Sequence, residues 1–183
     1  TLFKKKRMMS EVVIQASGGS IADKNKAAEE LSKLALQDPI LLVRLHAVSK
    51  LGELDCQASH EALREAGRDP EAKVRLAAVN AWRKMSSETA VPMLQKILGS
   101  DTNVDVRLEA TEALGDFSGS PSIAALRMAL SDSDPAILAR AKQSMARVSG
   151  ESFGDDLRAW RQYADHIVGS PDRTAADTST KLK

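Results

Sequence analysis

The chain has 183 residues, of which 43% are hydrophobic and 28% charged, and its formal net charge is +1. This composition is ordinary for a globular domain and argues against disorder along most of the chain. No apolar run approaches the roughly 20 residues that span a bilayer, and the single cysteine, Cys56, excludes an intramolecular disulfide or a cysteine zinc cluster.

The first predicted element is a basic N-terminal arm or short helix over residues 1–20. Residues 1–26 carry six Lys/Arg and two Asp/Glu, whereas residues 27–168 carry 17 and 21, so a basic segment precedes a mildly acidic body. Such a segment can be a solvated run of charges that leads into a capping helix. It can instead contact an acidic protein partner, an anionic membrane surface or nucleic acid. The residues predicted to make this contact are Lys4, Lys5, Lys6 and Arg7.

Residues 21–150 contain an internal repeat with a period of 31 or 32 residues. Each clear copy has an aspartate followed six residues later by an arginine. A recurrence of this length is typical of arrays in which each copy is one supersecondary structure. The three clear copies are Asp38/Arg44, Asp69/Arg75 and Asp101/Arg107.

An apolar stripe runs through every copy at offsets of 4, 4 and 3 residues, which places its side chains on one face of a helix. We name this helix the B helix, and a second recurring stripe predicts an A helix before it. The sequence therefore predicts an all-α fold, an α-α superhelix of about four helix pairs. The B stripes are Val43/Ala47/Leu51/Leu54, Val74/Ala78/Trp82/Met85, Val106/Ala110/Leu114/Phe117 and Ile137/Ala141/Met145/Val148, and the A helices share Leu31, Leu63, Leu94 and Leu126.

The recurring polar residues have predicted structural roles. Asp38 and Asp69 each precede a proline, which predicts helix N-caps with proline at the first helical position. We expect the motif arginine to donate a charge-assisted hydrogen bond to the capping aspartate of a neighbouring repeat, which would form a ladder along the array.

The fourth copy departs from the pattern, and two registers are open. In the register of the apolar stripe, Asp132 is the aspartate and Leu138 replaces the arginine. In the other register, Asp134-Pro135 is the cap and Arg140 is the arginine. We favour the first because the second places polar residues on the core face, and we expect the helix to start at Asp134-Pro135.

Residues 151–168 are predicted to form a C-terminal capping helix, because the end of a repeat array must be closed. We expect this helix to bury Trp160 against the fourth B helix. In an alternative interpretation it docks on a partner through Trp160 and Tyr163, since aromatic residues dominate interface hot spots. Residues 169–183 are rich in Ser, Thr and Asp and are predicted to be a flexible tail.

The pattern Asp-Pro-x3-Val-Arg-x2-Ala-x3-Leu-Gly resembles the HEAT repeat, especially the short bacterial class that also occurs in phycobilisome lyases. The resemblance covers about residues 24–148, and Leu51-Gly52 completes the motif, whereas the second copy has Trp82-Arg83 at this place. The resemblance implies a HEAT-like α-solenoid. It says little about function, because one fold carries many functions.

The histidines His46, His60 and His166 fall in different helices, and no catalytic constellation is visible. The HEAT-like deoxyhypusine hydroxylases bind iron through repeated His-Glu pairs that follow the motif arginine. Here the sole His-Glu pair, His60-Glu61, lies on an A helix and is not repeated. Because a metal site needs several converging ligands, we predict no catalytic residue, no metal and no cofactor.

These observations predict a non-catalytic scaffold or adaptor that binds a protein partner and acts as a subunit of a larger assembly, with no small-molecule substrate. The absence of a signal peptide and the single cysteine favour the cytoplasm. One alternative is a bilin-lyase-like accessory protein or chaperone, by resemblance. Another is peripheral binding to a membrane or nucleic acid through residues 4–7, although nucleic acid is not expected because the acidic body lacks a basic groove.

Overall fold

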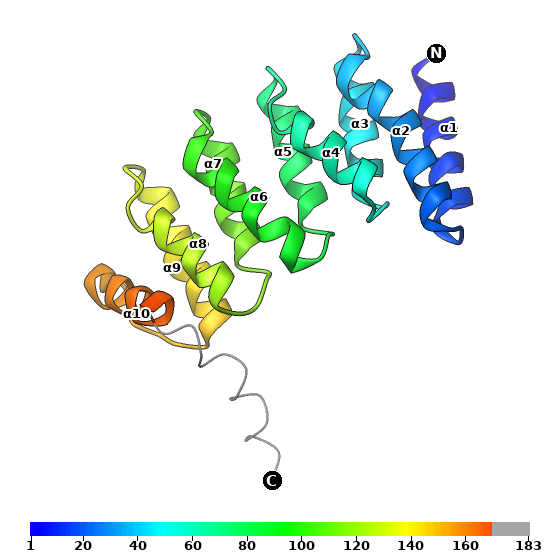
Figure 1. Cartoon of the computed structure of the whole chain (residues 1–183). Coiled ribbons are helices and arrows are strands. Elements are labelled where there is room, and N and C mark those ends of the chain that lie inside the picture. Colours follow the sequence, from blue (N-terminus) through cyan, green and yellow to red (C-terminus); the bar gives the residue numbers. More distant parts are fainter. Residues whose placement is uncertain (170–183) are drawn as a thin grey trace. The chain divides into compact units, whose positions relative to one another are not determined.

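The computed structural model describes residues 1–169, apart from the side chain of Ser87. Over these residues the chain forms ten α-helices and no strand (Figure 1). The predicted flexible tail lies, beyond Gly169, outside the described residues. The chain divides into two compact parts, unit 1 (Thr1–Met93) and unit 2 (Leu94–Lys183), and each unit is described by itself.

Unit 1 contains an N-terminal helix followed by two helix pairs. Like helices stack, because the A helix α2 packs against α4 and the B helix α3 packs against α5. Helix α1 packs against α2 and α3. The helices are α1 (Leu2–Ser17), α2 (Ile21–Gln37), α3 (Leu41–Leu51), α4 (Gln57–Ala66) and α5 (Ala72–Trp82).

Unit 2 continues the alternation of A and B helices and ends in an additional helix. The B helix α7 packs against α9, and the A helix α8 packs against α9 and α10. Helix α6 (Ser87–Ser100) runs across the division between the units. The helices that follow are α7 (Val104–Leu114), α8 (Ser120–Ala129), α9 (Pro135–Ser149) and α10 (Leu157–Gly169).

The predicted stripes form the core of each unit. The B-stripe residues are buried in all four copies, except that Val148 in the last copy is half-buried. The four A-helix leucines are also buried. Truncation of a buried leucine to alanine typically costs about 2–5 kcal/mol, so these positions hold the helix pairs together.

The motif glycines stand where the next B helix crosses closely. In unit 1, a Cβ atom at Gly52 would lie 2.9 Å from Ala81 Cα on α5. In unit 2, a Cβ atom at Gly115 would lie 2.7 Å from Ser144 Cβ on α9. A side chain at either position would therefore force the neighbouring helix to shift.

The predicted N-caps at Asp38 and Asp69 are wrong by two residues. The N-caps are Ile40 for α3 and Glu71 for α5, so the prolines lie before the helices. The physical reason is that each aspartate closes a turn with the backbone N–H two positions later and thereby delays the helix. Helix α9 does begin as expected, with Asp134 as N-cap and proline at the first position.

The C-terminal helix was predicted to pack on the fourth B helix. It packs instead on the A helix α8. After α9 the chain turns through two glycines with positive φ, Gly150 (73°) and Gly154 (53°), which returns α10 to α8. Arg161 of α10 then donates from Nη2 to the Leu130 carbonyl at 2.6 Å. This carbonyl lies at the C-terminal end of α8, where it has no partner in the helix itself.

Candidate functional site

Four aspartates in the turns between A and B helices share one hydrogen-bonding pattern. Each accepts, through Oδ1, the backbone N–H of the residue two positions later. The second carboxylate oxygen is then left for a cation. The four bonds run from Ile40 to Asp38, Glu71 to Asp69, Asn103 to Asp101 and Asp134 to Asp132, at 2.8–3.0 Å.

In unit 1 the cations come from the preceding helix layer. Lys5 of α1 pairs with Asp38, and Arg44 Nε of α3 donates to Asp69 Oδ2 at 3.1 Å. Arg44 Nη1 also donates to the Asp38 carbonyl at 3.1 Å, so one guanidinium joins the turns of two successive repeats. Arg75 donates to the Asp69 carbonyl at 2.9 Å in the same way.

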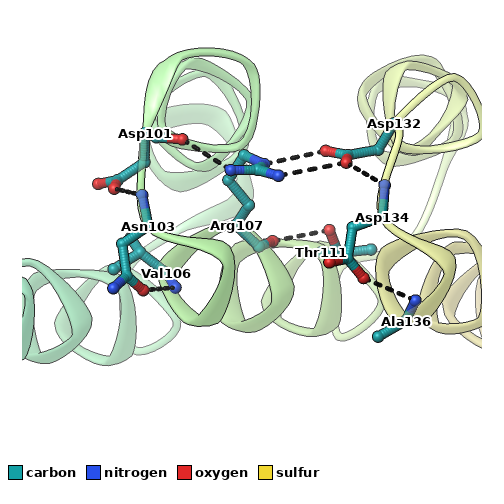
Figure 2. Close-up of polar contacts among 8 residues, drawn as sticks. All are labelled: Asp101, Asn103, Val106, Arg107, Thr111, Asp132, Asp134 and Ala136. Carbon is teal, nitrogen blue, oxygen red and sulfur yellow. Dashed lines mark hydrogen bonds and ion pairs between the residues drawn. The ribbon is translucent and has the colours of Figure 1, made fainter.

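Unit 2 repeats this arrangement around Arg107 (Figure 2). Its Nε donates to Asp132 Oδ2 at 2.9 Å, its Nη2 to Asp132 Oδ1 at 3.2 Å and its Nη1 to the Asp101 carbonyl at 3.1 Å. The side chain of Asp134 takes no part in this contact, because it caps α9 by accepting the Ala136 N–H. Asp132 therefore takes the place of the motif aspartate, as in the favoured register.

These ion pairs are well enclosed. The Arg107 and Asp132 side chains are only 16% and 12% exposed. Their hydrogen bond lowers the pKa of Asp132 and raises that of Arg107, and the hydrogen bond from Lys5 lowers the pKa of Asp38. Because these charges already have partners within the fold, the pairs join repeats rather than offering a site for a ligand.

The outer side of α1 exposes large apolar side chains next to basic ones. Phe3 is 77% exposed and Ile14 is 73% exposed, the two highest values among the large hydrophobic residues described. Their spacing, with Arg7 between them, places them on one helical face, opposite the face that packs on α2 and α3. We name this surface the α1 face; it consists of Phe3, Lys4, Arg7, Met8, Glu11 and Ile14.

The structure separates the four basic residues predicted to bind a partner. Lys4 and Arg7 are exposed on the α1 face, and Arg7 Nε donates to Glu11 at 2.7 Å. Lys5 is instead held by Asp38, and Lys6 is half-buried. Sequence reasoning missed Phe3 and Ile14. The helical spacing of the buried residues Met9, Val13 and Ala16 would have indicated them, because Phe3 and Ile14 fall outside the face that these residues form.

Trp160 and Tyr163 do not form the exposed pair of anchors that the alternative interpretation required. Trp160 is only 2% exposed, and its Nε1 donates to the Gly154 carbonyl at 3.0 Å. The Phe153 ring stands edge-on to Trp160 with 4.8 Å between the ring centroids. Tyr163 is half-buried against the same phenyl ring. These rings hold the turn before α10.

The histidines do not converge. His46 lies on α3 with Nε2 buried and without a hydrogen-bond partner, and burial together with Lys6 and Lys50 lowers its pKa. His60 Nε2 lies 2.6 Å from Asp55 Oδ1. Among residues 1–169, no group of three or more His, Cys, Asp or Glu side chains is placed to hold a metal ion.

The family model of HEAT repeats matches residues 28–115 and 61–146. The chain belongs to the HEAT-repeat family. The predicted fold class, an all-α α-α superhelix, is thus confirmed for this HEAT-repeat protein. HEAT repeats often mediate protein interactions. None of the helices within residues 1–169 is long and apolar enough to cross a membrane. No curated protein matches the chain.

Among solved structures, the HEAT-repeat protein is similar to human deoxyhypusine hydroxylase in complex with glycerol. The sequence identity is 25%, the TM-score is 0.60, and the likeness covers 68% of this chain. It covers 44% of the hydroxylase chain, so this protein matches less than half of that enzyme's length.

This likeness contradicts the predictions that the protein is not an enzyme and that it is a non-catalytic scaffold. Those predictions rested on the repeat array and on the absence of a visible catalytic constellation. The array holds the helices together whether or not a HEAT-repeat protein is catalytic, so it does not decide the question. The iron site that the resemblance to deoxyhypusine hydroxylases implies is nevertheless not matched by the described residues. His60 is bound to Asp55, and His46 lies beside two lysines.

Proposed function

We propose that this HEAT-repeat protein binds a polypeptide through the α1 face. The observation that carries the proposal is the exposure of Phe3 and Ile14 on one helical face beside Lys4 and Arg7. Phe3 and Ile14 lie 11 residues apart, about 16 Å along the helix axis, so they would act as two separate apolar anchors for a partner. Aromatic and arginine side chains also contribute disproportionately to binding energy.

The chemistry of the α1 face defines the partner. An amphipathic helix could place its apolar side chains on Phe3 and Ile14, because helices are recognised by their apolar stripe. Acidic residues flanking that stripe would meet Lys4, while Arg7 is already paired with Glu11. Such complementary charges mainly raise the association rate and select the partner.

A photo-crosslinking experiment tests the proposal. A benzoylphenylalanine replaces Phe3 in one variant and Leu42, an exposed residue of α3, in the control variant. We expect a discrete crosslinked polypeptide from a lysate of the source cells with the first variant only, and its loss when Ile14→Ser is added. Equal crosslinking from both positions, or binding to anionic vesicles in place of a polypeptide, contradicts the proposal.

A second candidate is catalysis on a polypeptide, which the likeness to deoxyhypusine hydroxylase favours. Polypeptide binding at the α1 face is compatible with it. This candidate rests on the likeness alone, because residues 1–169 hold no group of metal ligands. Mass spectrometry of a deoxyhypusine-containing polypeptide, incubated with the protein, divalent metal ions, dioxygen and a two-electron reductant, would show one gained oxygen atom, with the second oxygen atom released as water. An unchanged mass would eliminate this candidate.

The existence of a protein partner and the cytoplasmic location stay predictions. Identification of the crosslinked polypeptide addresses the first. Microscopy of the fluorescently tagged protein in its source cells addresses the second.

A further inference from the structure

A groove between the A helices α2 and α4 of unit 1 takes no part in the ion-pair ladder or in the α1 face. Its volume is about 240 Å³. The residues that line it recur at helical spacing on both helices, so each helix contributes one face. They include Glu29 and Leu36 from α2, and Ala58, Glu61, Ala62 and Glu65 from α4.

Three apolar side chains line the groove, those of Leu36, Ala58 and Ala62. Leu36 is 39% exposed although it is a large aliphatic residue. Ala58 and Ala62 lie opposite on α4, where their small side chains leave the space open. An alkyl chain placed in the groove would therefore be removed from water on more than one side, which is favourable in proportion to the apolar area covered.

The groove is also negatively charged. Three carboxylates line it, from Glu29, Glu61 and Glu65, and its lining contains no lysine or arginine. Glu61 accepts a hydrogen bond from the neutral amide of Gln57 at 3.0 Å, so its charge is not cancelled. Glu65 pairs with Arg68, but both side chains are more than half exposed, and such pairs are weak.

Two other hollows lack this combination. A larger one of about 390 Å³ in unit 2 is lined by Arg107 and Asp132, which neutralise each other. Another, of about 220 Å³ between α1 and α2, has Lys26 in its lining beside Asp23 and Glu30. The α2–α4 groove thus combines apolar side chains with carboxylates, and no lysine or arginine lines it.

We propose that this groove binds a lysine- or arginine-rich segment of a protein partner. The volume is below the about 300–1,000 Å³ typical of sites for drug-sized molecules, which fits one long side chain. Lysine and arginine bury an aliphatic stem along apolar surface while the charged end stays in polar surroundings. Here the stem lies on Leu36 and Ala58, and the cation lies among the carboxylates.

This ligand differs from the apolar and acidic partner proposed for the α1 face. The two proposals rest on different helices and different charges, so each is tested by its own variants.

Fluorescence anisotropy with labelled oligolysine and oligoarginine peptides of equal length tests the proposal on the full chain. The groove variant is Glu29→Gln, Glu61→Gln and Glu65→Gln, and the control variant is Glu71→Gln, Glu88→Gln and Glu151→Gln, which makes the same change in net charge. We expect about tenfold weaker binding for the groove variant and less than about a twofold change for the control. Circular dichroism confirms that both variants are folded.

A second variant tests the groove without removing its acidic residues. Ala58→Lys places the protein's own cation and alkyl stem in the hollow, so we expect it to weaken peptide binding as strongly as the groove variant. Equal losses in the groove and control variants, or no effect of Ala58→Lys, would overturn the proposal. Binding of spermidine as tight as that of the peptides would also overturn it, because a small polyamine would then be the ligand.

Discussion

Arg107 holds two successive turns of unit 2 through three hydrogen bonds, and two of them form a fork on Asp132. Arg107→Ala leaves a mostly enclosed carboxylate without its partner, so we predict a loss of about 2 kcal/mol in the free energy of unfolding. Arg107→Lys keeps the charge but not the fork and should lose part of this amount. Urea denaturation at neutral pH measures both.

The matched control for this prediction is Arg127→Ala. Arg127 pairs with Asp165, but both side chains are about half exposed, so the expected loss is below about 1 kcal/mol. A loss from Arg107→Ala no larger than that of the control would mean that the ladder does not stabilise unit 2.

His46 is a residue whose protonation opposes folding. Burial, with Lys6 and Lys50 nearby, lowers its pKa in the folded state, so the unfolded state binds the proton more readily. Its stabilising effect is therefore full above the ordinary pKa of about 6.5 and is lost as the pH falls below that value towards the lowered pKa. We predict that the free energy of unfolding falls between about pH 7 and pH 5, and that His46→Gln flattens this fall.

Denaturation curves at a series of pH values check this prediction, with His166→Gln on the exposed side of α10 as the control. The control should keep the slope of the unmodified protein. The pKa values of Asp38 and Asp132 are also lowered, so their contribution is lost only as the pH falls below the ordinary carboxyl pKa of about 3.9. Equal slopes for His46→Gln and the unmodified protein would contradict the account of His46.

The helix packing depends on small residues where B helices cross. At Gly115 an added Cβ would meet Ser144 and Arg147 of α9, and we predict that Gly115→Ala costs about 1–3 kcal/mol of stability. Gly18 has φ of −93° and no atom within 4 Å of its Cβ position. Gly18→Ala should therefore be neutral or stabilising by up to about 1 kcal/mol. Thermal unfolding of both variants tests the difference, and equal melting temperatures would contradict it.

The helices themselves were predictable from the sequence because their buried residues recur with the helical period. Val43, Ala47 and Leu51, for example, place one face of α3 in the core, and this face is buried. The helix starts were less predictable, because Asp38 makes two contacts. One carboxylate oxygen accepts the Ile40 N–H and closes a turn, and the other pairs with Lys5. Periodicity along one helix does not reveal that a distant lysine uses the second carboxylate oxygen.

The position of α10 was not predictable for a similar reason. The apolar face with Trp160 indicates that the helix is buried on one side, and this side is buried. It does not indicate which helix covers that side. The two glycines with positive φ decide this, together with the bond from Arg161 to Leu130.

At the scale of the whole molecule, the repeats predict the family but not the function. The residues that recur, such as Arg44 and Arg107, join one repeat to the next and would do so in an enzyme or in a binding protein. The residues that carry the proposed function occur once. Phe3 and Ile14 lie in α1, before the first full pair, so the repeat pattern does not point to them.

Unit 1 carries two surfaces of opposite chemistry, the apolar and basic α1 face and the acidic α2–α4 groove. Each is proposed for a different polypeptide segment, so variants in one should leave the other's binding unchanged. This independence separates specific recognition from a general attraction between charges.

The central claim is that the α1 face binds a polypeptide, and the affinity of the crosslinked partner for paired variants tests it most directly. Calorimetry would compare two double variants. The first combines Phe3→Ser and Ile14→Ser, and the control combines Leu42→Ser and Val168→Ser, which removes two exposed apolar side chains elsewhere. We predict a Kd at least about tenfold weaker for the α1 pair, since each apolar side chain lost is worth about 1.5–3 kcal/mol when fully buried. The control pair should bind as the unmodified protein does, and equal affinities for the two pairs would contradict the claim.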